Sequence, residues 1–154
     1  MSMDSFFTRL NPLISGILRS PLHWMLSPGL LLITVTGRRT GRRYTIPVGY
    51  QRDGETLAVM VSEARRKSWW RNYREPGPVE VRLRGRSHPG RAELVAPATD
   101  EFRRAATRTL QRMPWLGRVF GINYDRRTGL SDEQLERLGE QIAMVRITLE
   151  RETD

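Results

Sequence analysis

The spacing of hydrophobic residues changes twice along the chain, and each change predicts a different kind of element. Near the start, apolar residues recur at intervals of three and four, the spacing of one helix face. Pro28-Gly29 ends this region, and short β-branched or alternating runs, typical of strands, follow as far as Val95. Helical spacing then returns. We expect a single domain, 1–154, made of a helical segment 1–27, a strand-rich core 28–95, and helices with one closing strand at 96–154.

Six runs have the composition of strands. Asp53-Gly54 between the second and third is a strong hairpin signal, and Gly85 marks a second hairpin. Pro47 cannot donate to a ladder, so it marks an edge or a bulge. Six antiparallel strands in a small domain most easily remove their edges by curling into a barrel. The predicted strands cover 30–36, 44–52, 56–62, 79–84, Gly85 to about Val95, and 142–149.

Three further patterns predict helices around these strands. Residues 67–74 form a turn or two of helix that a Pro-Gly-Pro sequence stops, and a longer helix begins at Thr99 and ends before Pro114. Ser131 caps another short helix, whereas 115–131 has no regular pattern. The expected fold class is therefore α+β, an antiparallel barrel with an N-terminal helix and flanking helices.

The positive charge is concentrated in the strand-rich part. The 154 residues include 26 basic and 17 acidic side chains, a net charge of +9, and 14 of the basic but only 5 of the acidic ones lie between Arg38 and Arg91. Such a concentrated field indicates an anionic partner, whether nucleic acid, a membrane surface, or a phosphorylated or carboxylated small molecule.

Conventional catalytic groups are scarce. The chain has no cysteine, which excludes disulfides and thiol chemistry and favours a cytoplasmic location. His23 and His88 are far apart and lack ligand spacing, so no metal site is expected. Nucleophile-elbow, Walker A and dinucleotide-binding glycine motifs are missing. An enzyme with this composition takes its reactivity from a cofactor.

The loop 37–43, Gly-Arg-Arg-Thr-Gly-Arg-Arg, is the first candidate site. Its glycines allow close backbone approach, its amides and the Thr40 hydroxyl can donate to phosphate oxygens, and its arginines supply charge. An arginine-rich hairpin tip is about as often a solvated turn or a contact to nucleic acid. The loop alone therefore leaves these alternatives open.

The segment 67–72, Lys-Ser-Trp-Trp-Arg-Asn, is the second candidate site. A tryptophan pair offers a flat wall for a ring system or a base, and Asn72 offers a directional amide. The alternative is a helix that plugs the end of the barrel, with Trp69 buried and Trp70 half exposed. Taken alone, the segment favours this alternative.

Together the motifs carry a resemblance. The run LLITVTGRRTGRRYTIPVGYQRDGETLAVMVS, followed by KSWWRN and PVEVRLRGR, resembles the deazaflavin-dependent nitroreductase family, split-barrel oxidoreductases that use coenzyme F-420, an 8-hydroxy-5-deazaflavin. The likeness is strong over about 28–95 and weak elsewhere. It implies a six-stranded split β-barrel of the FMN-binding type. It also implies hydride transfer from the reduced coenzyme to an electrophilic small molecule such as a quinone, nitroaromatic or enone.

The resemblance implies which residues hold the cofactor. In the family, the loop after the first strand contacts the phosphate side and the second strand lines the ring. The end of the next strand and the short helix complete the pocket. The corresponding residues here are Arg38, Arg39, Thr40, Tyr44, Thr45, Ile46, Pro47, Val48, Met60, Val61, Ser62, Lys67, Ser68, Trp69, Trp70, Arg71 and Asn72.

Two positions depart from the family pattern or lie outside it. Glu63 stands where the best-known relatives carry a lysine, and Arg65, Arg66 or Lys67 would have to supply the missing charge. Some relatives place a substrate-side tyrosine in the C-terminal part, and Tyr124 is the candidate here. The proton that completes the reaction would come from solvent or from the Tyr124 hydroxyl, which makes Tyr124 the candidate catalytic residue.

Three rival functions remain open on the sequence. One is an FMN-dependent split-barrel oxidoreductase, and another is a barrel that binds nucleic acid by stacking bases on the tryptophans. The third is a lipid- or fatty-acid-binding barrel without redox activity. Because the basic segment coincides with the cofactor motifs, we expect no nucleic-acid partner, and a small-molecule electron acceptor instead.

The sequence also bears on location and assembly. No apolar stretch is long enough to span a bilayer. The N-terminal helix either packs on the core, which we favour, or lies as a peripheral contact on the inner face of the membrane. A homodimer is open as well, because split barrels often pair.

Overall fold

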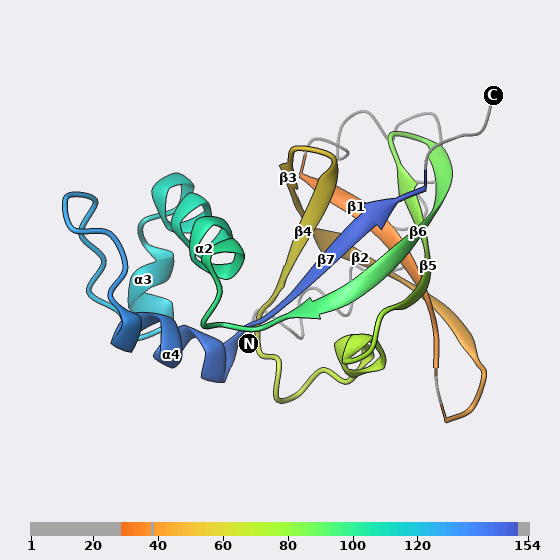
Figure 1. Cartoon of the computed structure of the whole chain (residues 1–154), viewed down its shortest axis with the longest axis horizontal. Coiled ribbons are helices and arrows are strands. Elements are labelled where there is room, and N and C mark those ends of the chain that lie inside the picture. Colours follow the sequence, from red (N-terminus) through yellow and green to blue (C-terminus); the bar gives the residue numbers. More distant parts are fainter. Residues whose placement is uncertain (1–28, 38, 151–154) are drawn as a thin grey trace.

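The computed structural model describes residues 29–37 and 39–150, so the expected N-terminal helix and Arg38 lie outside the described residues. Figure 1 shows a curled β-sheet with a layer of helices beside it. The elements in chain order are β1 (Leu30–Thr36), β2 (Arg43–Gly49), β3 (Gln51–Asp53), β4 (Thr56–Val61), the 3-10 helix η2 (Trp69–Tyr73), β5 (Gly77–Leu83), β6 (Arg86–Val95), α2 (Asp100–Arg112), α3 (Leu116–Val119), α4 (Asp132–Gln141) and β7 (Ala143–Leu149).

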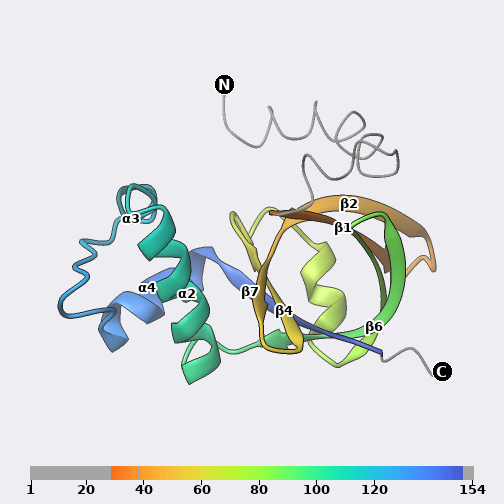
Figure 2. The same ribbon diagram turned by 90° about the horizontal axis from the view of Figure 1, so that it is seen from above.

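The described strands form one antiparallel sheet in the order β2-β1-β5-β6-β7-β4-β3. Seen from above, the sheet curls round so that its two ends approach each other (Figure 2). β2 comes close to β4 without pairing with it, as in a split barrel. The expected antiparallel barrel is therefore confirmed, and the last strand pairs back between β6 and β4.

The expected count of six strands is wrong by one. The run 44–52 divides at Tyr50 into β2, which pairs with β1, and β3, which pairs with β4. Gly49 is the last residue opposite β1, and Gln51 is the first opposite β4. Between them the Tyr50 amide donates to the Gly29 carbonyl, 3.3 Å away. At this point the chain passes from one end of the sheet order to the other, which brings those ends together.

Both predicted hairpins form. Gly54 has φ of +62° in the β3–β4 turn. In the β5–β6 turn Arg84 and Gly85 have φ of +51° and +79°, the signs of a type I′ turn. Pro47 lies on β2, which ends the sheet order, so the predicted edge position is confirmed.

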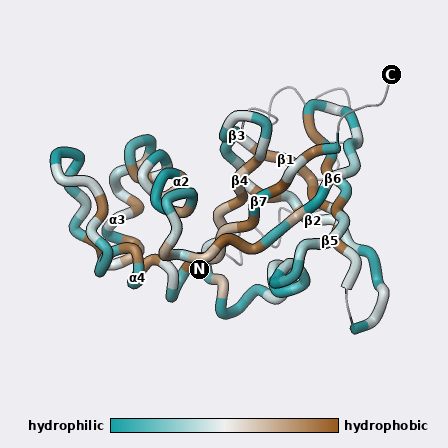
Figure 3. The backbone as a smooth tube through the Cα atoms, viewed as in Figure 1, coloured by the Kyte–Doolittle hydropathy of each residue, from teal (hydrophilic) through white to brown (hydrophobic). Residues whose placement is uncertain are grey.

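Alternate side chains of the strands feed two separate apolar clusters. On β4, Leu57, Val59 and Val61 point into the barrel, whereas Ala58 and Met60 contact the helices. The hydrophobic stretches of Figure 3 follow the strands, and hydrophilic residues collect at the hairpin turns. The helical layer thus packs on the outside of the β4–β7 wall, and its cluster contains Val95, Phe102, Ala105, Ala106, Leu110, Ile122, Leu130, Leu135, Leu138, Ile142 and Met144.

Both longer helices begin where the sequence predicts. The Thr99 hydroxyl accepts from the Phe102 amide at the start of α2. Ser131 and Gln134 form a reciprocal capping box at the start of α4. α3 lies in the region expected to be irregular, because four helical residues are too few to establish a periodic pattern.

Polar contacts fix the helical layer to the sheet. Arg146 of β7 lies 2.6 Å from a Glu93 carboxylate oxygen and 2.7 Å from one of Glu101, at the start of α2. Gln51 of β3 donates to the Ala105 carbonyl, 3.2 Å away. These half-buried pairs join α2 to both β3 and β7, so the layer is held at two places.

Candidate functional site

The β1–β2 loop is held in shape by its own hydrogen bonds. The Gly37 amide donates to the Arg42 carbonyl at 2.8 Å, and the Gly41 amide donates to the Gly37 carbonyl at 2.9 Å. The Arg42 amide donates to Thr40 Oγ1 at 3.3 Å. The expectation that loop amides cradle a phosphate is therefore wrong for these three amides, because each is used inside the loop. An anion at the tip would meet guanidinium groups and the Thr40 hydroxyl proton instead.

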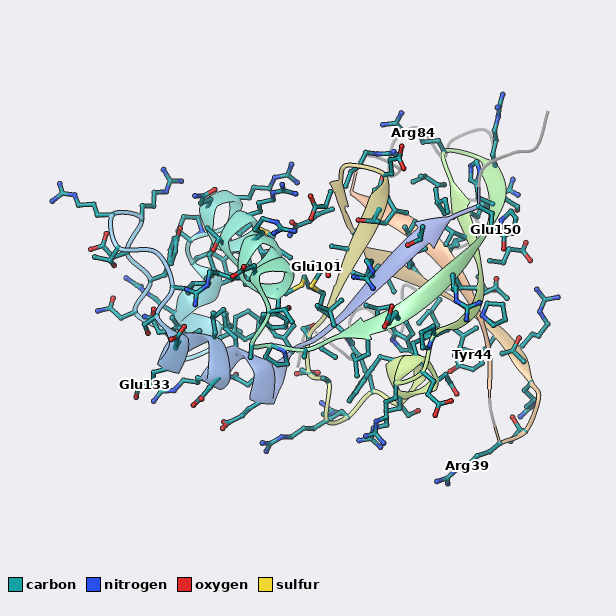
Figure 4. The ribbon with its side chains drawn as sticks, in the orientation of Figure 1. Arg39, Tyr44, Arg84, Glu101, Glu133 and Glu150 are labelled. Carbon is teal, nitrogen blue, oxygen red and sulfur yellow. The ribbon has the colours of Figure 1, made fainter. Side chains whose placement is uncertain are left out.

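Two of the described loop arginines have no acidic partner. Arg43 is paired, with Nη2 3.0 Å from Glu80 Oε2. Arg39 and Arg42 are exposed and form no ion pair with any residue in the described ranges. Figure 4 shows Arg39 at the hairpin tip, pointing away from the barrel. Two such cations beside a hydroxyl are suited to bind phosphate or carboxylate oxygens.

β2 presents its side chains alternately to two faces. Ile46 and Val48 pack against the barrel core. Thr45 lies on the other face, where its hydroxyl is 2.8 Å from that of Thr34, and the alternation puts Pro47 on the same side. The structure therefore does not gather all the predicted β2 residues on one surface. Ile46 and Val48 shape the strand from inside.

The start of β2 meets η2 through a polar contact. Tyr44 is 37% exposed, and Figure 4 shows it beside η2. Burial raises the pKa of Tyr44, and a hydrogen bond with the Asn72 side chain lowers that pKa. Asn72 also donates to the Trp69 carbonyl at 2.8 Å, which fixes the direction of its amide. Burial first, and then the nearby Tyr44, raise the pKa of Tyr73 to about 12, so both phenols stay protonated at neutral pH.

η2 closes the end of the barrel. Trp69 is 6% exposed and Tyr73 3%, and their rings meet edge to face with centroids 6.4 Å apart. Trp70 is half-buried, and its Nε1 donates to the Ala64 carbonyl at 2.8 Å. The alternative interpretation of this segment, a plug with Trp69 buried and Trp70 partly exposed, is confirmed. Trp69 is thus a core residue, and it lies beneath the more exposed residues of η2.

The predicted cofactor residues at the end of β4 also lie in different environments. Val61 is buried in the barrel, Met60 contacts the helices, and Ser62 is exposed. Glu63 has φ of +52°, and its carboxylate lies 3.6 Å from Arg66 Nη1. Arg66, one of the three residues expected to replace the family's lysine, is therefore already paired with the carboxylate beside it.

The remaining predicted residues lie around η2. Ser68 and Arg71 are exposed, and Lys67 is half-buried. The Arg71 guanidinium carbon lies 5.4 Å from the centroid of the Trp70 ring. Arg71 therefore belongs with Trp70, not with the Tyr44–Asn72 contact.

Tyr124 lies in the helical layer. It packs there with Leu116, Phe120 and Met60 against the second cluster. Its hydroxyl is buried and has no hydrogen-bond partner among the described residues. Met60, from the predicted cofactor set, packs against the same cluster from β4. The role of Tyr124 as a proton donor stays a prediction.

Sequence reasoning missed Tyr73 and Glu80. Tyr73 follows Trp69 by four residues, and this helical spacing was a usable signal for a shared buried face. Glu80 meets Arg43 across 37 residues of sequence, and no local pattern identifies such a partner.

The fold is similar to that of two solved structures. A structure from Listeria innocua, named as a pyridoxamine 5'-phosphate oxidase, matches with a TM-score of 0.50 at 12% identity, covering 92% of this chain and 94% of that one. Another, described as a domain-swapped dimer, matches with a TM-score of 0.51 at 15% identity, covering 88% and 98%. At these identities the likeness concerns the fold alone, which is that of split-barrel proteins.

A comparison of the sequence with protein-family models identifies the family of this chain. The family model F420H(2)-dependent quinone reductase matches residues 19–120, and the chain belongs to this family. It is therefore an F-420-dependent reductase, as the resemblance implied. No curated protein matches the chain at a significant level. None of the described helices is long and apolar enough to cross a membrane.

Proposed function

We propose that the β1–β2 loop, the start of β2 and η2 together bind reduced coenzyme F-420, and that the acceptor is a small electrophile such as a quinone, nitroaromatic or enone. When bound, the coenzyme supplies a hydride. The observation that carries the proposal is the pair of unpaired guanidinium groups, Arg39 and Arg42, on the hairpin whose second strand brings Tyr44 to Asn72. Cationic and neutral hydrogen-bonding groups are thus arranged in sequence along one hairpin.

The loop residues bind the anionic part of the coenzyme. Arg39, Arg42 and the Thr40 hydroxyl present donors with no competing carboxylate, whereas Glu80 neutralises Arg43. Charge-assisted hydrogen bonds of this kind are roughly twice as strong as neutral ones. Arg38, from the predicted set, would add to the same charge.

The residues at the start of β2 orient the ring. Tyr44 stays protonated at neutral pH, and Asn72, itself held by the Trp69 carbonyl, fixes its position, so the Tyr44 hydroxyl is the donor that this contact offers. The chain thus contributes positioning, which accounts for a large part of the rate in such transfers.

The acceptor is proposed to approach from the helical side. Met113, Trp115 and Val119 are 39%, 54% and 59% exposed, an unusual display of large apolar side chains at the α2–α3 corner. Tyr124, which packs against the cluster of the helical layer, is the candidate proton donor on that side, with solvent as the alternative. An apolar quinone or nitroaromatic suits such a surface better than a charged acceptor.

Binding of the coenzyme tests the site. We expect Arg39→Ala and Arg42→Ala each to weaken F-420 binding about tenfold, because each removes one charge-assisted contact, with the thermal unfolding midpoint unchanged. Arg84→Gln is the matched control, since Arg84 lies at the β5–β6 turn, away from Arg39 (Figure 4). Unchanged affinity in both loop variants would place the coenzyme elsewhere.

Turnover tests the reaction. We expect the wild-type chain to oxidise reduced F-420, seen as recovery of its visible absorption, when a quinone, enone or nitroaromatic is added. Titration with FMN is run in parallel. Tight FMN binding without any oxidation of reduced F-420 would contradict the proposal and support the FMN alternative.

A further inference from the structure

A pocket of about 420 Å³ lies where η2 meets the junction of α4 and β7. Its walls are largely apolar and come from four segments of the chain. Trp70 forms the η2 side, and its ring is held by the hydrogen bond to Ala64. The apolar lining residues are Ala64, Trp70, Leu94, Val95, Ala96, Pro97, Ile142 and Ala143.

The rim of this pocket carries more positive than negative charge. Arg65, Arg71 and Arg74 line it, and Glu140 is the carboxylate among the lining residues. None of these three arginines forms an ion pair with a residue that the structure describes. The Arg71 and Arg74 guanidinium carbons lie 5.4 Å and 5.9 Å from the centroid of the Trp70 ring, which holds both cations at the pocket.

The pocket is separate from the proposed cofactor site at the β1–β2 loop and the start of β2. Leu94 and Ala143 belong to β6 and β7 in the middle of the sheet order, whereas β2 lies at its end. η2 contributes different residues to the two sites. Asn72 forms a hydrogen bond with Tyr44 of β2, whereas Trp70 donates to the Ala64 carbonyl at the pocket. Trp70, assigned to the cofactor by resemblance, lines this second pocket.

We propose that this pocket is a second binding site and that it takes an amphipathic carboxylate, a ligand with a flat or aliphatic body and one anionic head. The body fits against Trp70 and Leu94, and the head fits between Arg65 and Arg74. A neutral ligand leaves three guanidinium groups unused, and a polyanion faces Glu140 and an apolar floor. A volume of this size is within the range of small-molecule sites.

Two probes with the same naphthyl body, one with an anionic and one with a neutral head group, test the site. Binding of 2-naphthoate and of 2-naphthylmethanol to the full chain is measured by isothermal calorimetry, with and without saturating F-420. We expect the naphthoate to bind, the double variant Arg65→Gln with Arg74→Gln to weaken it roughly tenfold, and the alcohol to bind weakly in both. Arg84→Gln with Arg86→Gln is the control, because it removes the same net charge at the far turn.

The outcomes distinguish this second site from the proposed cofactor site. Undiminished naphthoate binding in the presence of F-420 supports a second site. Displacement of naphthoate by F-420 would overturn the proposal and assign the pocket to the cofactor. Absence of naphthoate binding, or equal weakening by the control pair, would also overturn it. Failure of F-420 itself to bind is a separate result, which bears on the proposed function alone.

Discussion

Asn72 joins two elements through one side chain. Its amide donates to the Trp69 carbonyl within η2 and also bonds to Tyr44 on β2. The amide nitrogen of an asparagine carries two N–H donors, so a single residue can fix both its own helix and a neighbouring phenol. The sequence pointed to Asn72 as a directional group, but it gave no reason to choose Tyr44 as the partner.

Asn72→Leu tests this contact. Burial raises the Tyr44 pKa and the hydrogen bond with Asn72 lowers it, so we expect loss of the amide to raise the Tyr44 pKa further. The measurement is an NMR titration of the Tyr44 ring carbon bonded to oxygen. Asn123→Leu, an exposed asparagine in the helical layer, is the control. An unchanged or lower Tyr44 pKa would show that the hydrogen bond does not form.

Because of Tyr73, the free energy of unfolding depends on pH in the alkaline range. Its pKa is raised from 10.0 to about 12 in the folded state, so folding favours the protonated phenol. This stabilisation is complete below pH 10 and is lost as the pH rises toward 12, where we expect the free energy of unfolding to fall by about 2 kcal/mol. Urea unfolding at a series of pH values measures it. Tyr73→Phe should remove most of this loss, and an identical pH dependence in that variant would contradict the assignment.

At the scale of elements, local signals predict most of the strands and their turns. Leu30–Thr36 matches the predicted strand at both ends, and the Thr99 and Ser131 caps begin the helices as expected. The division at Tyr50 was missed, because a change of pairing partner depends on β1 and β4 and leaves no mark in the local pattern. Glu63 was read for its charge alone, since its positive φ follows from the path of the chain after β4.

The β5–β6 turn offers a stabilising change. Arg84 has φ of +51° directly before Gly85, and asparagine tolerates this conformation better than arginine. We therefore expect Arg84→Asn to raise the free energy of unfolding by about 0.5 kcal/mol, measured by chemical denaturation. Arg86→Asn, two positions further on and inside β6, is the control and should not stabilise. A destabilised Arg84→Asn variant would mean that the arginine side chain makes a stabilising contact at this turn.

At the scale of the whole molecule, the sequence predicted a barrel but not the position of its helical layer. The two clusters separate on β4 and β7 by residue parity, which can be read only when the neighbouring strands are known. For the same reason the pocket between η2, β6 and β7 had no sequence signal. Its arginines were visible as charge, but Leu94 and Ile142 join them only in the folded chain.

Gly139 tests how closely α4 packs against Pro97, in the segment between β6 and α2. A Cβ there would lie 2.5 Å from Pro97 Cγ and 2.6 Å from its Cβ, so the proline has to move. We expect Gly139→Ala to lower the free energy of unfolding by about 1 kcal/mol, because the clash outweighs the helix preference of alanine. Glu136→Ala, exposed on the same helix, is the control for helix preference. A stabilised Gly139→Ala variant would show that α4 and Pro97 can move apart at little cost in free energy.

The place of β7 has a consequence for the order in which the molecule can be built. β7 is the last described strand in the chain, yet it lies between β6 and β4. A nascent chain that has not yet released β7 from the ribosome holds two separate sheets, β2-β1-β5-β6 and β4-β3, with no ladder between them. The wall that supports both the helical layer and the second pocket therefore forms only after synthesis has passed Leu149, later than either of the two separate sheets.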